Sequence, residues 1–185
     1  EKRPGDPKIS NVLDSLYQVD KEMDLSWQSI TETNKDKVYS QYKDNFEKSL
    51  LKEPLISTTA KILLSSLLKK VEDSKKLPED LDIEFLISSS LKLASHFLKL
   101  QDTKNENKSL ELLVDISEDK ITSSRSLQSE WIKGITQLAE NMRTDSQYLK
   151  AGKLYIQLAD KTIDWEGRGE ALYKGGLLLY RGGRK

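Results

Sequence analysis

Apolar residues recur at intervals of three and four along most of this chain, and no stretch alternates apolar and polar side chains for more than a few residues. The first pattern is that of amphipathic helices, and the second would be needed for strands. Only four prolines interrupt the 185 residues. The sequence therefore predicts an all-α fold, an elongated bundle of about six to eight helices with no sheet.

Polar or proline-containing breaks separate the expected helices. The predicted ranges are 7–31, 38 to Pro54, 57–71, 78–100, 108–117, 124–143, 145–161 and 165–181. Several helix starts are marked by a proline in the first turn or by a capping residue such as Asp or Ser just before the helix. These signals are Asp6-Pro7, Pro78, Thr144 to Ser146, and Asp164. Gly134 interrupts the helix over 124–143, which indicates close contact with another helix.

The expected domain organisation is a disordered tail at 1–6 and a single helical domain over 7–185. The segment 101–107, QDTKNEN, is predicted to be a surface loop open to proteases. A hinge there between two lobes is the alternative. In the first helix, Ile9, Leu16, Met23 and Ile30 are spaced by seven. This pattern fits a helix packed on the domain, or alternatively a stalk or dimer helix in an otherwise monomeric protein.

Composition excludes several function classes. The chain has no cysteine, so it has no thiol catalysis, no Cys-based zinc site and no disulfide. Its 30 basic and 30 acidic residues lack the basic excess of nucleic-acid binders. The longest apolar run, Leu177 to Tyr180, is far shorter than the roughly 18–20 residues of a transmembrane helix. The start, EKRPGDPK, is expected to be that of a mature or truncated product.

No catalytic, metal or cofactor site is predicted. The single histidine, His96, lies in a strongly apolar helix and is expected to be structural. The acidic pairs Glu79-Asp80 and Glu118-Asp119 are expected at solvated helix starts. Gly167-Arg168-Gly169 resembles half of a dinucleotide fingerprint, but position 172 is leucine and no strand precedes it.

The segment 161–185 combines glycine, aromatic and basic residues more densely than any other part of the chain. On a helix over 165–181, one stripe is predicted to pack on the bundle: Trp165, Leu172, Gly176 and Leu179. Ala171 and Gly175 are four apart and would let another backbone come close. A second set is the candidate protein-binding surface, because Arg and Tyr anchor protein interfaces: Arg168, Tyr173, Lys174, Tyr180 and Arg181, with Arg184 and Lys185 beyond them.

Residues 147–183 also loosely resemble one tetratricopeptide-type helix pair, through Ala151, Tyr155, Ala159, Ala171 and Tyr180. Such units recur about every 34 residues, and no second copy is found upstream. An intracellular helical scaffold with a tetratricopeptide-like C-terminal hairpin is therefore an alternative function.

Two sequence segments resemble those of a known family: KISNVLDSLYQVDKEMDLSWQSI, residues 8–30, and DWEGRGEALYKGG, residues 164–176. With the cysteine-free, Lys- and Ser-rich helical composition, they resemble the C-terminal domain of an outer-surface lipoprotein of Lyme spirochaetes. The family is the OspEF-leader-peptide (Elp) group, once classed with the OspE/F-related (Erp) lipoproteins. The chain departs from that family in lacking the lipid-bearing N-terminal cysteine and a long acidic tract.

The resemblance implies a non-enzymatic virulence protein on the bacterial surface, lipid-anchored to the outer membrane upstream of this sequence. It implies host-protein partners, chiefly the initiating serine proteases of the classical complement pathway, and sometimes laminin or fibronectin. Inhibition of complement, by steric or allosteric means, would serve immune evasion. No cofactor is implied. The family supplies no residue-level binding motif, so the site residues above rest on their chemistry alone.

Overall fold

The computed structural model describes residues 40, 43–48, 50, 57–74 and 82–184, and all of its regular structure in these ranges is helical. The all-α class is confirmed. The chain divides into two compact units, Glu1–Ser66 and Leu67–Lys185. In the first unit, residues 40, 43–48 and 50 are helical, as predicted, and Phe46 is fully buried. Helix α3, Ser57–Ser74, crosses the division between the units.

The predictions that concern residues 1–39 lie outside the described residues. They include the tail at 1–6 and the seven-residue stripe of the first helix. The single domain over 7–185 and the hinge at 101–107 stay predictions.

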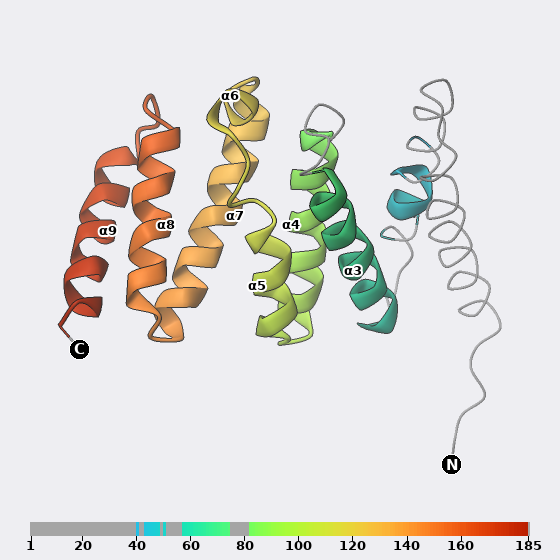
Figure 1. Cartoon of the computed structure of the whole chain (residues 1–185), viewed down its shortest axis with the longest axis horizontal. Helices are drawn as coiled ribbons and strands as arrows, with labels where there is room; N and C mark the ends of the chain where they lie inside the picture. The colour runs from blue at the N-terminus through green and yellow to red at the C-terminus, as the bar shows by residue number, and fades with distance from the viewer. Residues whose placement is uncertain (1–39, 41–42, 49, 51–56, 75–81, 185) are drawn as a thin grey trace, which may run out of the picture. The chain divides into compact units, whose positions relative to one another are not determined.

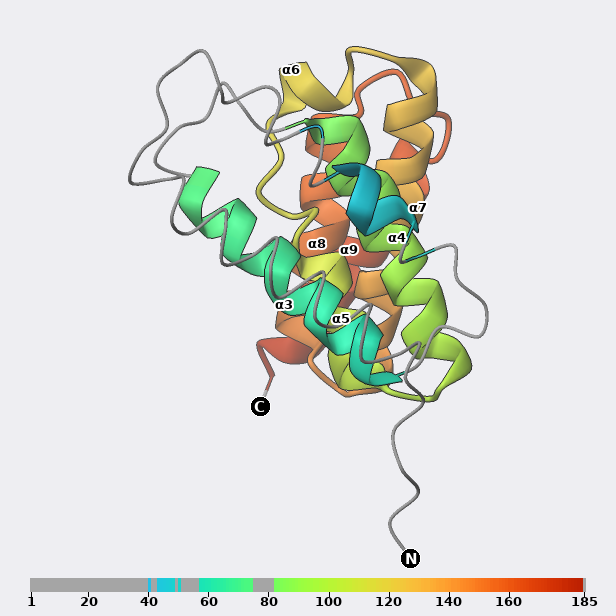
Figure 2. The same cartoon turned by 90° about the vertical axis from the view of Figure 1, so that its right-hand side faces the viewer.

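The second unit is a row of antiparallel helices (Figure 1). Figure 2 looks along the row and shows the short α6 across one end of α7. In chain order the elements are α4 (Ile83–Lys99), α5 (Thr103–Glu111), α6 (Glu118–Ile121), α7 (Arg125–Thr144), α8 (Tyr148–Lys161) and α9 (Arg168–Gly182). Helix α7 packs on α4 and α5 at one side and on α8 at the other, and α9 packs chiefly on α8.

Trp131 of α7 is the largest fully buried side chain of the described core. Its indole Nε1 donates a hydrogen bond to the carbonyl oxygen of Leu113, 2.8 Å away, in the turn after α5. One turn further along α7, a Cβ on Gly134 would lie 2.4 Å from Cδ1 of Leu113 and 3.1 Å from Cδ2 of Leu91. The close helix contact predicted for Gly134 is therefore confirmed.

Helices α4 and α5 are joined by a tight turn rather than by a loop. Gln101 has φ 56°. Its N–H donates to Leu98, and the N–H of Asp102 donates to Phe97, which makes a Schellman motif at the end of α4. The Asp102 side chain then accepts from the N–H of Asn105 and caps α5. The predicted surface loop at 101–107 is therefore wrong, because Thr103 to Asn107 form the first turns of α5.

A second turn of the same type joins α7 to α8. Ser146 has φ 59°, and the N–H groups of Ser146 and Gln147 donate to Arg143 and Met142. The N-cap of α8 is Gln147, which makes no side-chain cap bond, so the cap predicted within Thr144 to Ser146 is wrong. The start predicted at Pro78 is also wrong, because Asp82 is extended and caps α4 through the N–H of Phe85.

Ser146 lies 45 positions after Gln101 (146 − 101), and this offset relates two whole hairpins. Each buried residue of α7 lies 45 positions after a buried residue of α4, and each buried residue of α5 lies 45 positions before a buried residue of α8. Helical repeats such as HEAT have periods of about 40–47 residues. The hairpin α4–α5 is therefore repeated as α7–α8, which the sequence did not predict. The prediction that the pair over 147–183 has no second copy upstream concerns α8–α9, and it stays a prediction.

Candidate functional site

Helix α9 begins three residues later than predicted. Its N-cap is Gly167, with no side-chain cap bond, so Asp164 is not the cap and Trp165 lies before the helix. The Trp165 ring covers Gly167 so closely that a Cβ there would lie 2.2 Å from Cζ2 of the indole. The N–H of Arg168 then donates to the carbonyl of Trp165 at 3.0 Å, which closes the turn that leads into α9.

The buried face of α9 consists of Ala171, Gly175 and Leu178. The predicted packing stripe is wrong at Leu172, which is 38% exposed, and at Gly176, where a Cβ would meet nothing within 4 Å. Leu179 does pack on α8, since a Cβ on Gly152 would lie 2.8 Å from its Cγ. The close approach predicted for Ala171 and Gly175 is confirmed at Gly175, where a Cβ would lie 2.8 Å from Cδ1 of Ile156 on α8, and Ala171 is buried. The packed face of α9 therefore combines small residues, Ala171 and Gly175, with Leu178.

The structure separates the five predicted site residues into three groups. Arg168 is attached to α8, since its Nε donates to the carbonyl oxygen of Ala159 at 3.1 Å. That carbonyl belongs to the last turn of α8, where a cation suits the helix dipole. Arg168 therefore stabilises the α8–α9 hairpin.

Lys174 also turns toward α8. Its Nζ lies 2.7 Å from Oε1 of Glu170 and 5.7 Å from the centre of the Tyr155 ring. The Tyr155 hydroxyl donates to Oε1 of Glu140 on α7, and Nε of Arg143 donates to the other oxygen of that carboxylate at 2.7 Å. These contacts form a polar chain across one side of α7, α8 and α9.

The pKa values follow from that chain. Burial opposes ionisation of Glu140, but the hydrogen bonds from Tyr155 and Arg143 outweigh it and lower the pKa. Burial and the hydrogen bond to Glu140 raise the pKa of Tyr155. The carboxylate is thus held ionised and the phenol neutral, as suits a structural contact rather than a proton-transfer pair.

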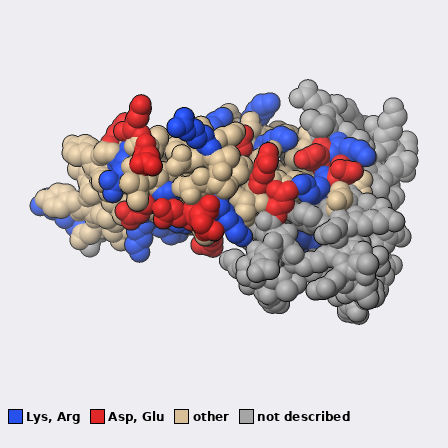
Figure 3. Space-filling view, turned by 90° about the horizontal axis from the view of Figure 1, so that it is seen from above, with Lys and Arg blue, Asp and Glu red and all other residues tan. Residues whose placement is uncertain are grey.

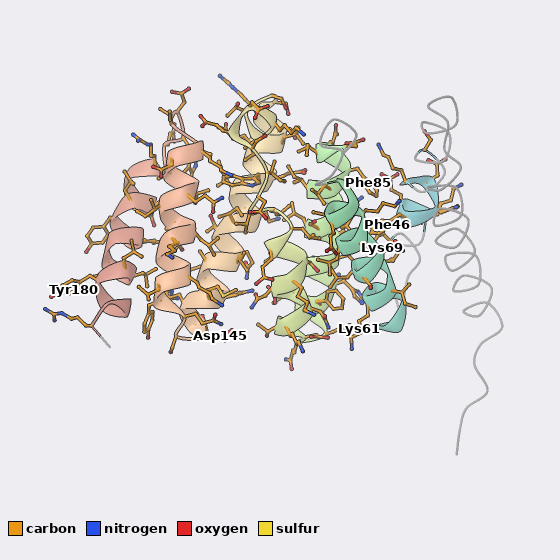
Figure 4. The ribbon with its side chains drawn as sticks, viewed as in Figure 1. Phe46, Lys61, Lys69, Phe85, Asp145 and Tyr180 are labelled. Carbon is orange, nitrogen blue, oxygen red and sulfur yellow. The ribbon has the colours of Figure 1, made fainter. Side chains whose placement is uncertain are left out.

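Tyr173, Tyr180 and Arg181 face away from the bundle. Tyr173 is 72% exposed and Tyr180 is 56% exposed, and Tyr180 extends from the free side of α9 (Figure 4). The Arg184 guanidinium lies 4.1 Å from the centre of the Tyr180 ring. Arg181 is exposed in the last turn of the helix. We call the side of α9 that carries Gly169, Tyr173, Gly176, Leu177 and Tyr180 the outer face.

Exposed apolar side chains gather at this end of the unit. Nine large hydrophobic residues are exposed in the described part of the chain, and six of them lie between Leu149 and Tyr180. The charges are not concentrated in the same way, since basic and acidic side chains are mixed over the surface seen in Figure 3. Exposed aromatic area with mixed charge is typical of a protein-contact surface.

His96 and the acidic pair Glu118-Asp119 are the other polar features that the sequence singled out in the described residues. His96 packs edge-on against Phe97, and burial and then the charge of Lys99 lower its pKa, which favours the neutral ring. Glu118 and Asp119 lie in the first turn of α6, as predicted. Within the described ranges, no cluster of three or more His, Asp or Glu side chains could hold a metal ion.

Sequence reasoning missed a buried polar network between α5 and α7. Glu106 is 3% exposed and accepts from Nδ2 of Asn141 at 2.9 Å, and that same nitrogen donates to Asn107 at 2.8 Å. Gln137 donates to Asn141 at 3.0 Å. The spacing of Gln137 and Asn141 by four was the available signal, but polar residues at helical spacing ordinarily indicate a solvated face.

The comparisons with known proteins give no relative: no family model, curated protein or solved structure matches this chain. No helix in the described ranges combines the length and the hydrophobicity needed to span a bilayer.

Proposed function

We propose that this chain is a non-enzymatic protein-binding module whose contact surface is the outer face of α9. One observation carries the proposal: Tyr173 and Tyr180, on one side of the last helix, are 72% and 56% exposed. Tyrosine and arginine supply most of the energetic anchors in protein interfaces. Arg184 lies over the Tyr180 ring and exposed Arg181 follows Tyr180 in the chain, so a partner with an apolar ridge and neighbouring carboxylates would fit this face.

The resemblance to the Elp and Erp lipoproteins supports a narrower proposal for the partner. It points to host proteins at a bacterial surface, first the initiating serine proteases of the classical complement pathway and then laminin or fibronectin. Binding would inhibit the protease by blocking its access to substrate or by changing its conformation. The gathering of exposed aromatic residues at one end supports an elongated contact with a folded protein rather than the enclosure of a small molecule.

The test is capture of serum proteins on the immobilised chain at physiological salt, read by mass spectrometry. We expect the native chain to retain a complement protease. The variant Tyr173→Ser/Tyr180→Ser should bind it about 30-fold or more weakly, because two anchors of about 1–2 kcal/mol each are lost. The matched control is Leu98→Ser/Leu100→Ser, which changes two exposed leucines on and after α4. Equal retention by the tyrosine variant would remove α9 as the site, and capture of no complement protease would remove the partner.

The alternative, an intracellular helical scaffold, is favoured by the α8–α9 hairpin. Ala151, Ala159 and Ala171, named for their resemblance to a tetratricopeptide pair, are all buried, at 0%, 0% and 2% exposure. Proteinase K treatment of intact cells that express the full-length protein separates the two functions. Digestion of the protein in intact cells supports the surface function, and protection until lysis supports the scaffold.

A further inference from the structure

Helix α9 contains an internal repeat of seven residues. GEALYKG, residues 169–175, is followed by GLLLYRG, residues 176–182, and then by Gly183. Residues seven apart occupy nearly the same side of a helix, since two turns take about 7.2 residues. Gly169 and Gly176 therefore form a row beside Tyr173 and Tyr180, and both rows lie on the outer face.

The monomer does not explain the glycines of that row. A Cβ on Gly169 or Gly176 would have nothing within 4 Å, although each exposed glycine costs a helix about 1 kcal/mol relative to alanine. By contrast, Gly175 and Gly182 face α8, where a Cβ would lie 2.8 Å from Ile156 and 2.7 Å from Leu149. A glycine between exposed tyrosines allows a second backbone to come close to the outer face.

The charges beside the outer face reverse along the helix. Glu170 lies in the first turn, where its exposed carboxylate also pairs with Lys174 at 2.7 Å, and Arg181 lies in the last turn. They are 11 positions apart, so they share one flank of α9 at about 3.6 residues per turn. Exposed Glu166 extends the acidic end, and exposed Arg184 extends the basic end. A helix charged in this way is complementary to itself when a second copy runs antiparallel.

We infer that two copies of this chain pair through α9, antiparallel, with the helices crossing at Gly176. In this register Gly169 faces Gly183 of the second copy, Tyr173 lies beside Tyr180, and Glu170 lies beside Arg181. The midpoint in sequence of each of the three pairs lies within one residue of Gly176. A two-fold axis requires such a common midpoint. A single helix pair buries less than about 1,000 Å², so the dimer is weak and depends on concentration.

The dimer does not rest on the proposed function, but it covers the same face. A second copy and a protein partner would therefore compete for the outer face. If the dimer fails, partner binding still stands, and if no partner is captured the dimer still stands. The two are measured separately, by mass in the purified protein and by capture from serum.

Disulfide cross-linking of the full chain tests the register, because the native sequence has no cysteine. Gly176→Cys places two thiols at the crossing point, within the Cα separation of about 4.4–6.8 Å that a disulfide needs. We expect mild oxidation to convert this variant to a covalent dimer. The matched variant Gly169→Cys remains monomeric alone, because its thiol faces position 183, and forms a dimer when mixed with Gly183→Cys.

Sedimentation equilibrium of the unmodified chain gives the second readout. We expect the mean mass to rise from 21.1 kDa toward twice that value as concentration increases. Glu170→Arg should return the protein to monomer, and Glu170→Arg with Arg181→Glu should restore the dimer by exchanging the charges. Gly176→Lys should be monomeric with undiminished helicity, since the monomer has open space there.

Three results would overturn the inference. One is a mass of 21.1 kDa at every concentration with no Gly176→Cys dimer. Another is equal cross-linking of Gly169→Cys and Gly176→Cys alone, which would place the helices parallel or show random collision. The third is a dimer that survives both Gly176→Lys and Glu170→Arg, which would place self-association on another surface.

Discussion

Gly152 of α8 and Gly175 of α9 face each other at backbone contact: a Cβ on Gly152 would lie 3.0 Å from the carbonyl oxygen of Gly175, and the reverse distance is 3.1 Å. Alanine at either position must push the helices apart. We expect Gly152→Ala and Gly175→Ala to cost about 1–3 kcal/mol of overpacking, offset by about 1 kcal/mol of helix propensity. Gly176→Ala, one residue away and facing open space, should instead stabilise by up to about 1 kcal/mol. Urea unfolding of the three variants measures these changes in the free energy of unfolding. Equal changes for Gly175→Ala and Gly176→Ala would contradict the prediction.

The two Schellman turns carry a strain that glycine would remove. Gln101 and Ser146 have φ 56° and 59°, in the left-handed region that costs a non-glycine residue about 1–2 kcal/mol. We expect Gln101→Gly and Ser146→Gly each to raise the free energy of unfolding by about 1 kcal/mol. Ser95→Gly, at an exposed position within α4, is the control and should lower it by a similar amount. If both turn variants unfold at a lower denaturant concentration than the native chain, the Gln101 and Ser146 side chains stabilise the fold by more than their backbone conformation costs.

The contact of Tyr155 with Glu140 predicts a pH dependence. The folded-state pKa of Glu140 is below its ordinary value of 4.5, so its contribution to stability is present above pH 4.5 and is lost as the pH falls through the lower folded-state pKa. Tyr155→Phe removes the hydroxyl that lowers this pKa. We expect the variant to be about 1.5–3 kcal/mol less stable at pH 7 and closer to the native chain at pH 3. A gap between the two proteins that does not change with pH would mean that Glu140 does not sense Tyr155.

Arg168 and Arg181 were predicted together but should behave differently. Arg168→Ala removes a hydrogen bond to the end of α8 and should lower the free energy of unfolding by about 1 kcal/mol. Arg181→Ala changes an exposed side chain and should leave stability within about 0.5 kcal/mol while weakening partner binding. Thermal unfolding and serum capture on both variants separate the two roles. Loss of binding from Arg168→Ala at unchanged stability would reverse the assignment.

Apolar spacing predicted the interior of the helices well and their ends poorly. The helix over 124–143 corresponds to α7, Arg125–Thr144, because a long row of apolar residues leaves one choice of face. The segment 101–107 was misread because its polar residues suggest a loop, whereas Asp102 caps a helix in which Glu106 and Asn107 are buried and bonded to α7. Such burial depends on a partner 34 residues away in sequence, which local patterns do not reveal.

The sequence predicted the residue types of the candidate site but not how those residues are placed in space. Tyr173 and Tyr180 are exposed as a binding surface requires, yet the same residue types gave no sign that Arg168 would reach Ala159. The 45-residue repeat escaped notice because the two hairpins share few residues. Over 82–116 and 127–161 only six positions are identical, at Ile87, Leu93, Ala94, Lys108, Leu113 and Asp115 of the first copy. Burial is conserved between the copies where identity is not.

The row of helices has a consequence for how the unit comes apart. When each helix is held by its neighbours alone, opening can begin at an end and pass inward one helix at a time. Helix α9 is held chiefly by α8, whereas α7 is held on both sides. Backbone amides should therefore exchange with deuterium fastest in α9, more slowly in α8, and slowest around Trp131. Protection from exchange should thus increase from the last helix toward α7.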